Sequence, residues 1–102
     1  MKTIGLIGGM SWESTITYYE VLNKEVVSAL GGFHSAKILM YSVDFAELEA
    51  NMSIGNWDGD AAILADAAKR LECAGADFIV IATNTMHKLV AAIETKFSMT
   101  QD

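Results

Sequence analysis

Three small polar residues, Thr83, Asn84 and Thr85, stand between an apolar run over 78–82 and a helical pattern. Such a corner presents hydroxyl groups, an amide and free backbone N–H groups to one point, where a small carboxylate or phosphate can bind. In parallel α/β sheets, ligands bind at the carboxyl ends of the strands. We therefore expect a binding site here. The residues by themselves leave an alternative equally open, in which Asn84 or Thr85 only caps the next helix.

Two further polar corners follow apolar runs earlier in the chain. The first is the glycine loop, residues 8–11 (Gly-Gly-Met-Ser), and the second is Ser42-Val43-Asp44. The glycine pair has neither the Gly-x-Gly-x-x-Gly spacing of a dinucleotide site nor the lysine of a P-loop. Judged in isolation, it is a tight turn more often than a ligand loop. Three corners on one sheet edge nevertheless predict a shared site.

The remaining reactive side chains are few. His87 falls in the first turn of the last expected helix, where it serves as a polar contact, a proton-handling group or a surface residue. Two histidines and one cysteine, all far apart, predict no transition-metal site. Cys73 shares the apolar stripe of a long helix, so we interpret it as part of the core and not as a nucleophile.

The elements that must position these residues follow from hydrophobic periodicity. Asp58 is a candidate N-cap, and residues 52–57 look like a loop long enough for a lid. The pattern predicts strands over 3–7, 37–42 and 78–81, and helices over 12–30, 45–51, 58–73 and 86–96. This order is typical of an α/β fold, a three-layer sandwich with a short parallel sheet, flavodoxin-like.

Composition narrows the class of protein. The 102 residues carry a net charge of -6, which disfavours nucleic acid and anionic membrane surfaces as partners. There is no apolar run long enough for a membrane span and no leader-like N-terminus. The single cysteine fits a reducing cytoplasm. We expect one domain over 1–96 and a polar tail over 97–102, with so few strands that an open sheet edge favours self-association.

Three segments, residues 8–15, 42–45 and 83–87, together resemble the aspartate/glutamate racemase family. The likeness runs over residues 1–95 and is nearest to the broad-specificity branch of enteric bacteria. It implies two similar α/β domains holding the substrate between them, of which this chain is the N-terminal half. It also implies proton transfer at Cα by two bases on opposite faces of the substrate, without pyridoxal phosphate or any other cofactor. Most members use two cysteines, whose thiolates form near neutral pH.

The resemblance also implies roles for single residues. Thr83 occupies the first cysteine position and is the catalytic candidate, although a hydroxyl can only relay a proton at neutral pH. The substrate-binding candidates are Asn84 and Thr85 on the substrate α-carboxylate, the backbone of Gly9, Met10 and Ser11 beside them, and Met52 near the substrate side chain.

The expected function is cofactor-independent racemisation or epimerisation of a small dicarboxylic amino acid, aspartate or glutamate. The expected partner is a second copy or a second racemase half. One alternative is an inactive half-domain that binds a small carboxylate or pairs with a partner half. Another is a module that binds phosphate or a nucleotide.

Overall fold

The computed structural model describes residues 1–82. The predicted helix over 86–96, the tail over 97–102 and the site candidates at 83–85 and 87 lie outside these residues. Along the described chain the elements are β1 (Thr3–Gly8), α1 (Trp12–Leu30), β2 (Lys37–Ser42), α2 (Phe45–Ser53), α3 (Trp57–Cys73) and β3 (Phe78–Ile81). The three strands therefore form where the apolar runs predict them, with β1 one residue longer.

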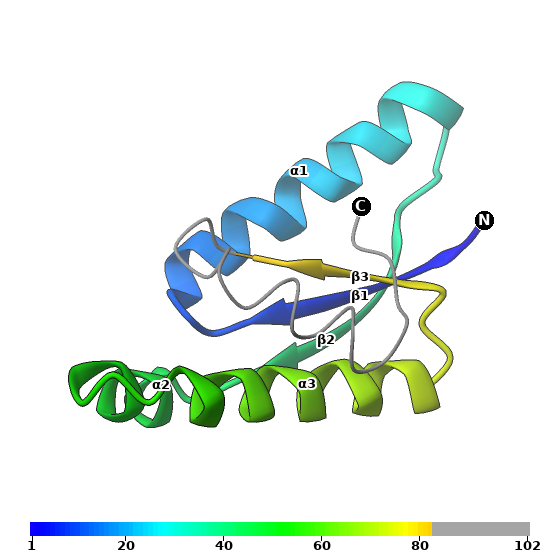
Figure 1. Cartoon of the computed structure of the whole chain (residues 1–102). Coiled ribbons are helices and arrows are strands. Elements are labelled where there is room, and N and C mark those ends of the chain that lie inside the picture. The colour runs from blue at the N-terminus through cyan, green and yellow to red at the C-terminus, as the bar shows by residue number, and fades with distance from the viewer. Residues whose placement is uncertain (83–102) are drawn as a thin grey trace.

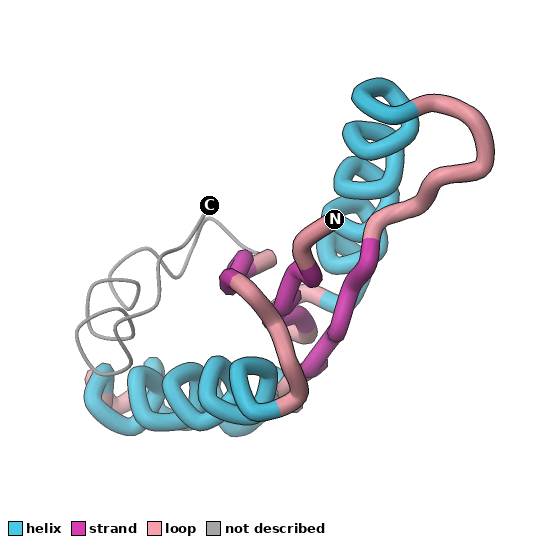
Figure 2. The backbone as a smooth tube through the Cα atoms, turned by 90° about the vertical axis from the view of Figure 1, so that its right-hand side faces the viewer, coloured by secondary structure: helices cyan, strands magenta, loops and turns pink. Residues whose placement is uncertain are grey.

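The three strands form one parallel sheet in the order β2-β1-β3. Strand β1 is central: Ile4 lies opposite Ile38 on β2 and opposite Phe78 on β3. Helix α1 lies on one side of the sheet, and α2 and α3 lie on the other (Figures 1 and 2). The predicted α/β architecture with a parallel sheet is confirmed. All three strands point the same way, so their carboxyl ends share one edge.

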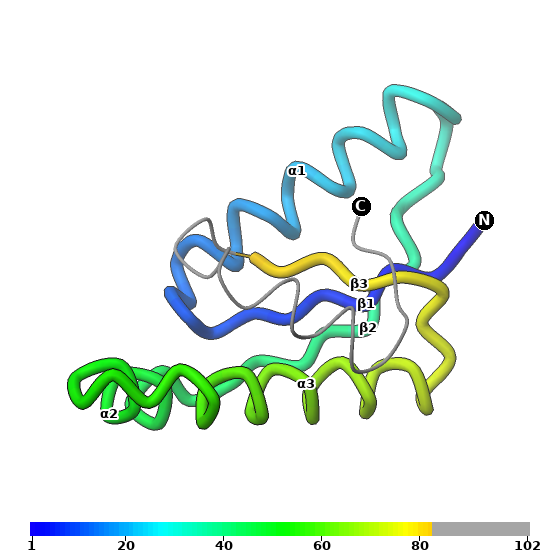
Figure 3. The backbone as a smooth tube through the Cα atoms, in the orientation of Figure 1, coloured from blue at the N-terminus to red at the C-terminus, as the bar shows by residue number. Residues whose placement is uncertain are grey.

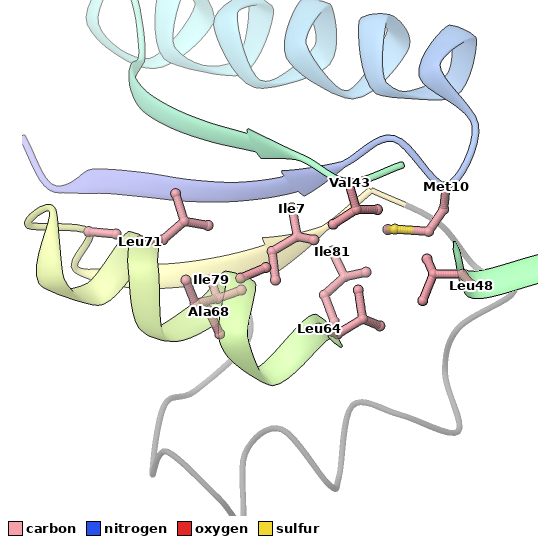
Figure 4. Packing of buried hydrophobic residues seen from close by; sticks show 11 residues of the cluster. Ile7, Met10, Val43, Leu48, Leu64, Ala68, Leu71, Ile79 and Ile81 are labelled. Atoms are coloured by element: carbon pink, nitrogen blue, oxygen red, sulfur yellow. The ribbon is translucent and has the colours of Figure 1, made fainter. Parts of the chain in front are cut away.

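The larger hydrophobic core lies between the sheet and α3. Helix α3 packs a stripe of small and branched side chains against the sheet. Because side chains alternate between the two faces of a strand, only every second residue of a strand faces α3. Figure 4 shows this packing. The cluster consists of Ile7, Met10, Val43, Leu48, Leu64, Ala67, Ala68, Leu71, Ala76, Ile79 and Ile81.

A smaller cluster covers the opposite face. Ile4, Leu6, Val80 and Ala82 are buried there, and Tyr18 and Leu22 of α1 pack against the group. Helix α1 starts close to the sheet and diverges from it toward its C-terminal end (Figures 1 and 3). Thr15 is accordingly its only buried residue. Most of the apolar side chains of α1 are left facing outward.

Three sequence-based expectations are wrong. The stretch 52–57 is not a lid loop, because α2 runs to Ser53 and α3 starts at Trp57. The cap of α3 is Asn56 instead of Asp58, since the Asn56 side chain accepts a hydrogen bond from the backbone N–H of Gly59 at 3.0 Å. Cys73 is exposed, because it lies at the last position of α3, beyond the stripe that the sheet covers.

Among residues 1–82, no helix has both the length and the apolar character that crossing a membrane would need.

Candidate functional site

The first two polar corners meet at the carboxyl edge of the sheet. The backbone N–H of Val43 donates to the carbonyl of Gly8 at 2.8 Å, which extends the β1–β2 ladder one residue past the end of β2. Gly9 has a φ of 95°, a left-handed conformation that residues with a Cβ rarely adopt. A Cβ placed on Gly9 would also collide with the backbone of Val43. Glycine at this position is therefore what allows the two corners to touch.

Thr15 fixes the glycine loop from the first turns of α1. Its hydroxyl Oγ1 accepts a hydrogen bond from the backbone N–H of Gly9 at 3.0 Å and donates to the carbonyl of Ser11 at 3.1 Å. Thr15 is only 5% exposed, so these bonds are shielded from water. The side chain of Ser11 caps α1 by accepting from the N–H of Ser14. The loop is thus built before any ligand arrives.

This bracing changes what the loop can offer to a ligand. The N–H of Gly9 already donates to Thr15, so it is not available to a ligand. In the described structure, Gly9 contributes through the backbone conformation that it allows. The donors that α1 presents at its start are the N–H groups of Trp12 and Glu13, because first-turn N–H groups have no acceptor inside the helix and that of Ser14 already donates to Ser11. Sequence reasoning missed Thr15; the usable signal was its position four residues after Ser11, one helical turn into the pattern.

The two methionines proposed for the site have their side chains in or against the core. Met10 is 5% exposed and packs near Leu48 and Val43 (Figure 4). Met52 lies near the end of α2, partly buried against the same cluster. The backbone of Met10 belongs to the glycine loop, and its contact with a substrate stays a prediction. A contact between Met52 and a substrate side chain stays a prediction.

The second corner adjoins an acidic hollow. Asp44 caps α2 by accepting from the N–H of Ala46 at 3.1 Å. Beside it, Asp44, Glu47 and Asp66 line a hollow of about 430 Å³ together with Tyr41, Ser42, Val43, Ala62 and Ile63. Among residues 1–82, only Asp66 of these three has a cation at ion-pair distance, because Arg70 Nε donates to it at 2.8 Å. This hydrogen bond and the charge of Asp66 raise the pKa of Arg70. A carboxylate ligand is disfavoured in this hollow by like charge.

Asp60 is an unexpected feature of the first turns of α3. Its side chain is fully buried, and neither carboxylate oxygen has a hydrogen-bond partner within the described part of the chain. Asp60 precedes Leu64 by one turn on the same face, and Leu64 packs near Ile81 at the end of β3 (Figure 4). A buried carboxylate without partners destabilises a fold. Sequence reasoning passed over it because a lone acidic residue early in a helix suits the helix dipole.

At this edge of the sheet, the described residues supply only part of the candidate site. They supply a rigid glycine loop, a helix start and a neighbouring strand end. Among residues 1–82, no group of three or more His, Cys, Asp or Glu side chains is arranged to hold a metal ion. The predicted residues Thr83, Asn84, Thr85 and His87 follow β3, the strand on the other side of β1, and lie outside the described residues.

Comparison with known proteins finds one matching family and similar solved structures. The sequence model of the Asp/Glu/hydantoin racemase family matches residues 7–100. A protein from Yersinia pestis, described as a candidate Asp/Glu racemase, has a crystal structure that matches with a TM-score of 0.95, at 52% identity over 99% of this chain. The crystal structure of an aspartate racemase homologue from Pyrococcus horikoshii matches with a TM-score of 0.85, at 34% identity over all of this chain.

The two solved relatives are much longer. This chain covers 44% of the Yersinia protein and 44% of the Pyrococcus protein. It therefore spans less than half the length of each structure that it matches.

Proposed function

The chain belongs to the Asp/Glu/hydantoin racemase family, and we propose that it is the N-terminal half of a cofactor-independent racemase or epimerase for acidic amino acids. The proposed substrates are aspartate and glutamate, and the proposed branch is the broad-specificity one. The observation that carries the proposal is the family match over 7–100, which includes all three polar corners of the sheet edge.

The geometry of the first corner supports a role in binding. The loop over 8–11 is held by Thr15 and by contact with Val43, so it needs no rearrangement to receive a ligand. A preformed loop loses little conformational entropy on binding. In this proposal the start of α1 and the backbone of Met10 and Ser11 face the substrate α-carboxylate, which Asn84 and Thr85 also bind.

The chemistry of the proposal is proton transfer at the substrate Cα. Thr83 is proposed to relay a proton, with His87 as a further proton-handling candidate. A hydroxyl does not ionise near pH 7, so Thr83 needs an acceptor beyond itself. The second base is proposed to come from another polypeptide segment, which fits the 44% coverage of the solved relatives. No metal or organic cofactor takes part, and the proposed location is the cytoplasm.

A second candidate function rests on that same coverage. A chain spanning less than half of its relatives can keep the carboxylate site without turnover, as a binding half-domain that pairs with another half. The third reading, a phosphate or nucleotide module, predicts different ligands. Binding data therefore separate these proposals before any enzyme assay is run.

The test is thermal unfolding of the full chain with candidate ligands. Aspartate, glutamate and succinate are expected to raise the midpoint by several degrees at saturating concentration, while phosphate and ATP leave it unchanged. Asn84→Ala should abolish the shift. Lys2→Ala, distant in sequence from every corner, is the matched control and should retain it. A shift with phosphate or ATP alone, or no shift with any carboxylate, contradicts the proposal.

A further inference from the structure

Helix α3 holds one carboxylate that no interaction within residues 1–82 uses. Asp60 is the only acidic residue of that range whose side chain is buried, and it is 0% exposed. Neither of its carboxylate oxygens accepts a hydrogen bond from the described residues. The carboxylates beside the second corner, those of Asp44 and Glu47, are both exposed. A buried polar group without partners is rare in folded proteins, and one of its recognised explanations is a part in catalysis.

The direction of α3 shows where Asp60 lies relative to the strands. Helix α3 starts at the carboxyl edge of the sheet and runs back toward the opposite edge (Figure 1). Its last turns meet the start of β1, because a Cβ placed on Gly5 would come within 3.2 Å of Cβ of Leu71. Two turns earlier, Leu64 packs near Ile81, the last residue of β3 (Figure 4). Residues closer to the start of α3 therefore lie farther toward the carboxyl edge.

The helical repeat places Asp60 just past the end of β3. Asp60 precedes Leu64 by four residues, so it lies on the same face of α3 and about 6 Å farther along the helix axis. Two residues of a strand span about 6.6 Å. Asp60 is therefore level with a point about two residues beyond Ile81. The chain continues there from Ala82 into Thr83, whose Cα is about 3.8 Å from that of Ala82 by covalent geometry alone.

The surroundings of Asp60 suit a group that takes up a proton. Its carboxylate has no hydrogen-bond donor among residues 1–82 to release first. The ion pairs of that range are Lys24 with Glu20 and Arg70 with Asp66, so no cation of these residues neutralises Asp60. Asp60 also belongs to the first turns of α3, where the helix dipole stabilises negative charge.

We propose that Asp60 is the acceptor of the proton that Thr83 relays from the substrate Cα. The inference rests on the proposed racemase function, in which that acceptor is otherwise unassigned. In this step the Cα–H bond breaks, and its electron pair stays on the substrate as a carbanion. The Cα proton moves to Oγ1 of Thr83 while the hydroxyl proton of Thr83 moves to the Asp60 carboxylate. The negative charge thus passes from Asp60 to the substrate, and Thr83 remains a neutral hydroxyl throughout.

The first test is α-proton exchange in D2O with the enantiomers of aspartate and glutamate. Asp60→Asn keeps the shape of the side chain, but its amide does not take up a proton, so exchange should fall roughly a hundredfold or more. Asp58→Asn is the matched control, because Asp58 is exposed in the same turn, and it should exchange like the wild type. Unchanged exchange in Asp60→Asn overturns this inference and leaves the proposed function standing. A wild-type chain without exchange removes the proposed function and this inference with it.

Binding and stability separate a chemical role from a structural one. Succinate should raise the thermal midpoint of Asp60→Asn by as many degrees as it raises that of the wild type. The midpoint of urea denaturation should be higher in Asp60→Asn, because the buried charge is gone. A variant that loses the succinate shift together with exchange would assign Asp60 to the architecture of the site, and it would overturn the proposal.

Chemical rescue identifies the missing group directly. Asp60→Ala removes the carboxylate and leaves space for a small one, so added formate should restore part of the exchange that this variant loses. Formamide has a similar shape and no negative charge, so it should restore none. Formate should also fail to rescue Thr83→Ala, in which the relay itself is missing. Equal recovery with formate and formamide, or no recovery in a folded Asp60→Ala chain that binds succinate, contradicts the proposal.

Discussion

At the scale of single residues, Gly9 decides how closely the two described corners approach each other. Its φ of 95° and the position of the Val43 backbone exclude any side chain there. Backbone atoms in a ladder cannot move aside as the end of a flexible side chain can. Glycine is therefore required at this position for a steric reason, and Thr15 holds the loop in place by accepting a hydrogen bond from the N–H of Gly9.

Gly9→Ala should destabilise the chain by about 2 kcal/mol or more, because it adds left-handed strain and a clash with Val43. Urea denaturation monitored by circular dichroism measures the loss. Gly32→Ala is the control: Gly32 also has a positive φ, 59°, but a Cβ there would meet nothing within 4 Å. Its loss should be about 1 kcal/mol, from backbone strain only. Equal losses for the two variants would contradict the close contact of the corners.

The buried side chain of Asp60 is expected to lower the stability of the fold. Asp60→Asn keeps the shape of the side chain and removes a buried carboxylate that has no hydrogen-bond partner among residues 1–82, so it should raise the free energy of unfolding at pH 7 by about 1–3 kcal/mol. Asp58→Asn, at an exposed position one half-turn earlier, should change it by no more than about 0.5 kcal/mol. The measurement is again urea denaturation. A loss of stability in Asp60→Asn would show that the carboxylate has a partner in the folded protein.

At the scale of elements, the connection between α2 and α3 is a short structural joint. Only residues 54–56 separate the two helices, and Asn56 closes the joint with both ends of its amide. Its Oδ1 accepts from the N–H of Gly59 at 3.0 Å, and its Nδ2 donates to Oδ1 of Asn51 at 3.2 Å. A segment held in this way does not behave as a lid.

Asn56→Ala should destabilise the chain by about 1 kcal/mol through loss of the α3 cap, whereas Asn56→Asp should retain most of the stability. Amide hydrogen exchange at Gly59 is the local readout, and it should become faster in Asn56→Ala. Unchanged exchange at Gly59 would mean that the cap does not hold the start of α3.

What the sequence predicts at this scale depends on how local the signal is. Short apolar runs ended by polar residues located the strands, and Ser11 and Gly31 marked both ends of α1. Periodicity could not tell which apolar stripe meets the sheet. It assigned Cys73 to the core although the sheet does not extend that far, and it did not reveal that α1 leaves its own stripe exposed. Those outcomes depend on the path of each helix relative to the sheet, which cannot be read from the periodicity of a single sequence.

The site was predictable to a similar extent. The glycine loop and the Ser42 corner stood out by residue type, and the parallel topology brought them together. Thr15 and Asp60 did not stand out by residue type. Thr15 matters because its buried hydroxyl bonds to Gly9, and Asp60 matters because its buried carboxylate has no hydrogen-bond partner among residues 1–82. The predicted roles of Thr83, Asn84, Thr85, His87 and Met52 stay predictions.

At the scale of the whole molecule, one edge of the sheet carries the proposed chemistry. The family match covers nearly all of the chain, yet the chain covers less than half of its solved relatives. The central claim is that this half takes part in proton transfer at the Cα of an acidic amino acid. Turnover to the opposite enantiomer requires a base on the second face, but proton removal from one face requires only Thr83 and the acceptor to which it relays the proton.

The most direct measurement is therefore exchange of the α-proton in D2O. The full chain is incubated with L- and D-aspartate and L- and D-glutamate, the α-proton signal is followed by NMR, and the enantiomers are separated by chiral chromatography. The account predicts loss of the α-proton signal for at least one enantiomer, abolished in Thr83→Ala and retained in Lys2→Ala. A folded chain that binds aspartate yet exchanges no α-proton, or exchanges it equally well in Thr83→Ala, would contradict the claim.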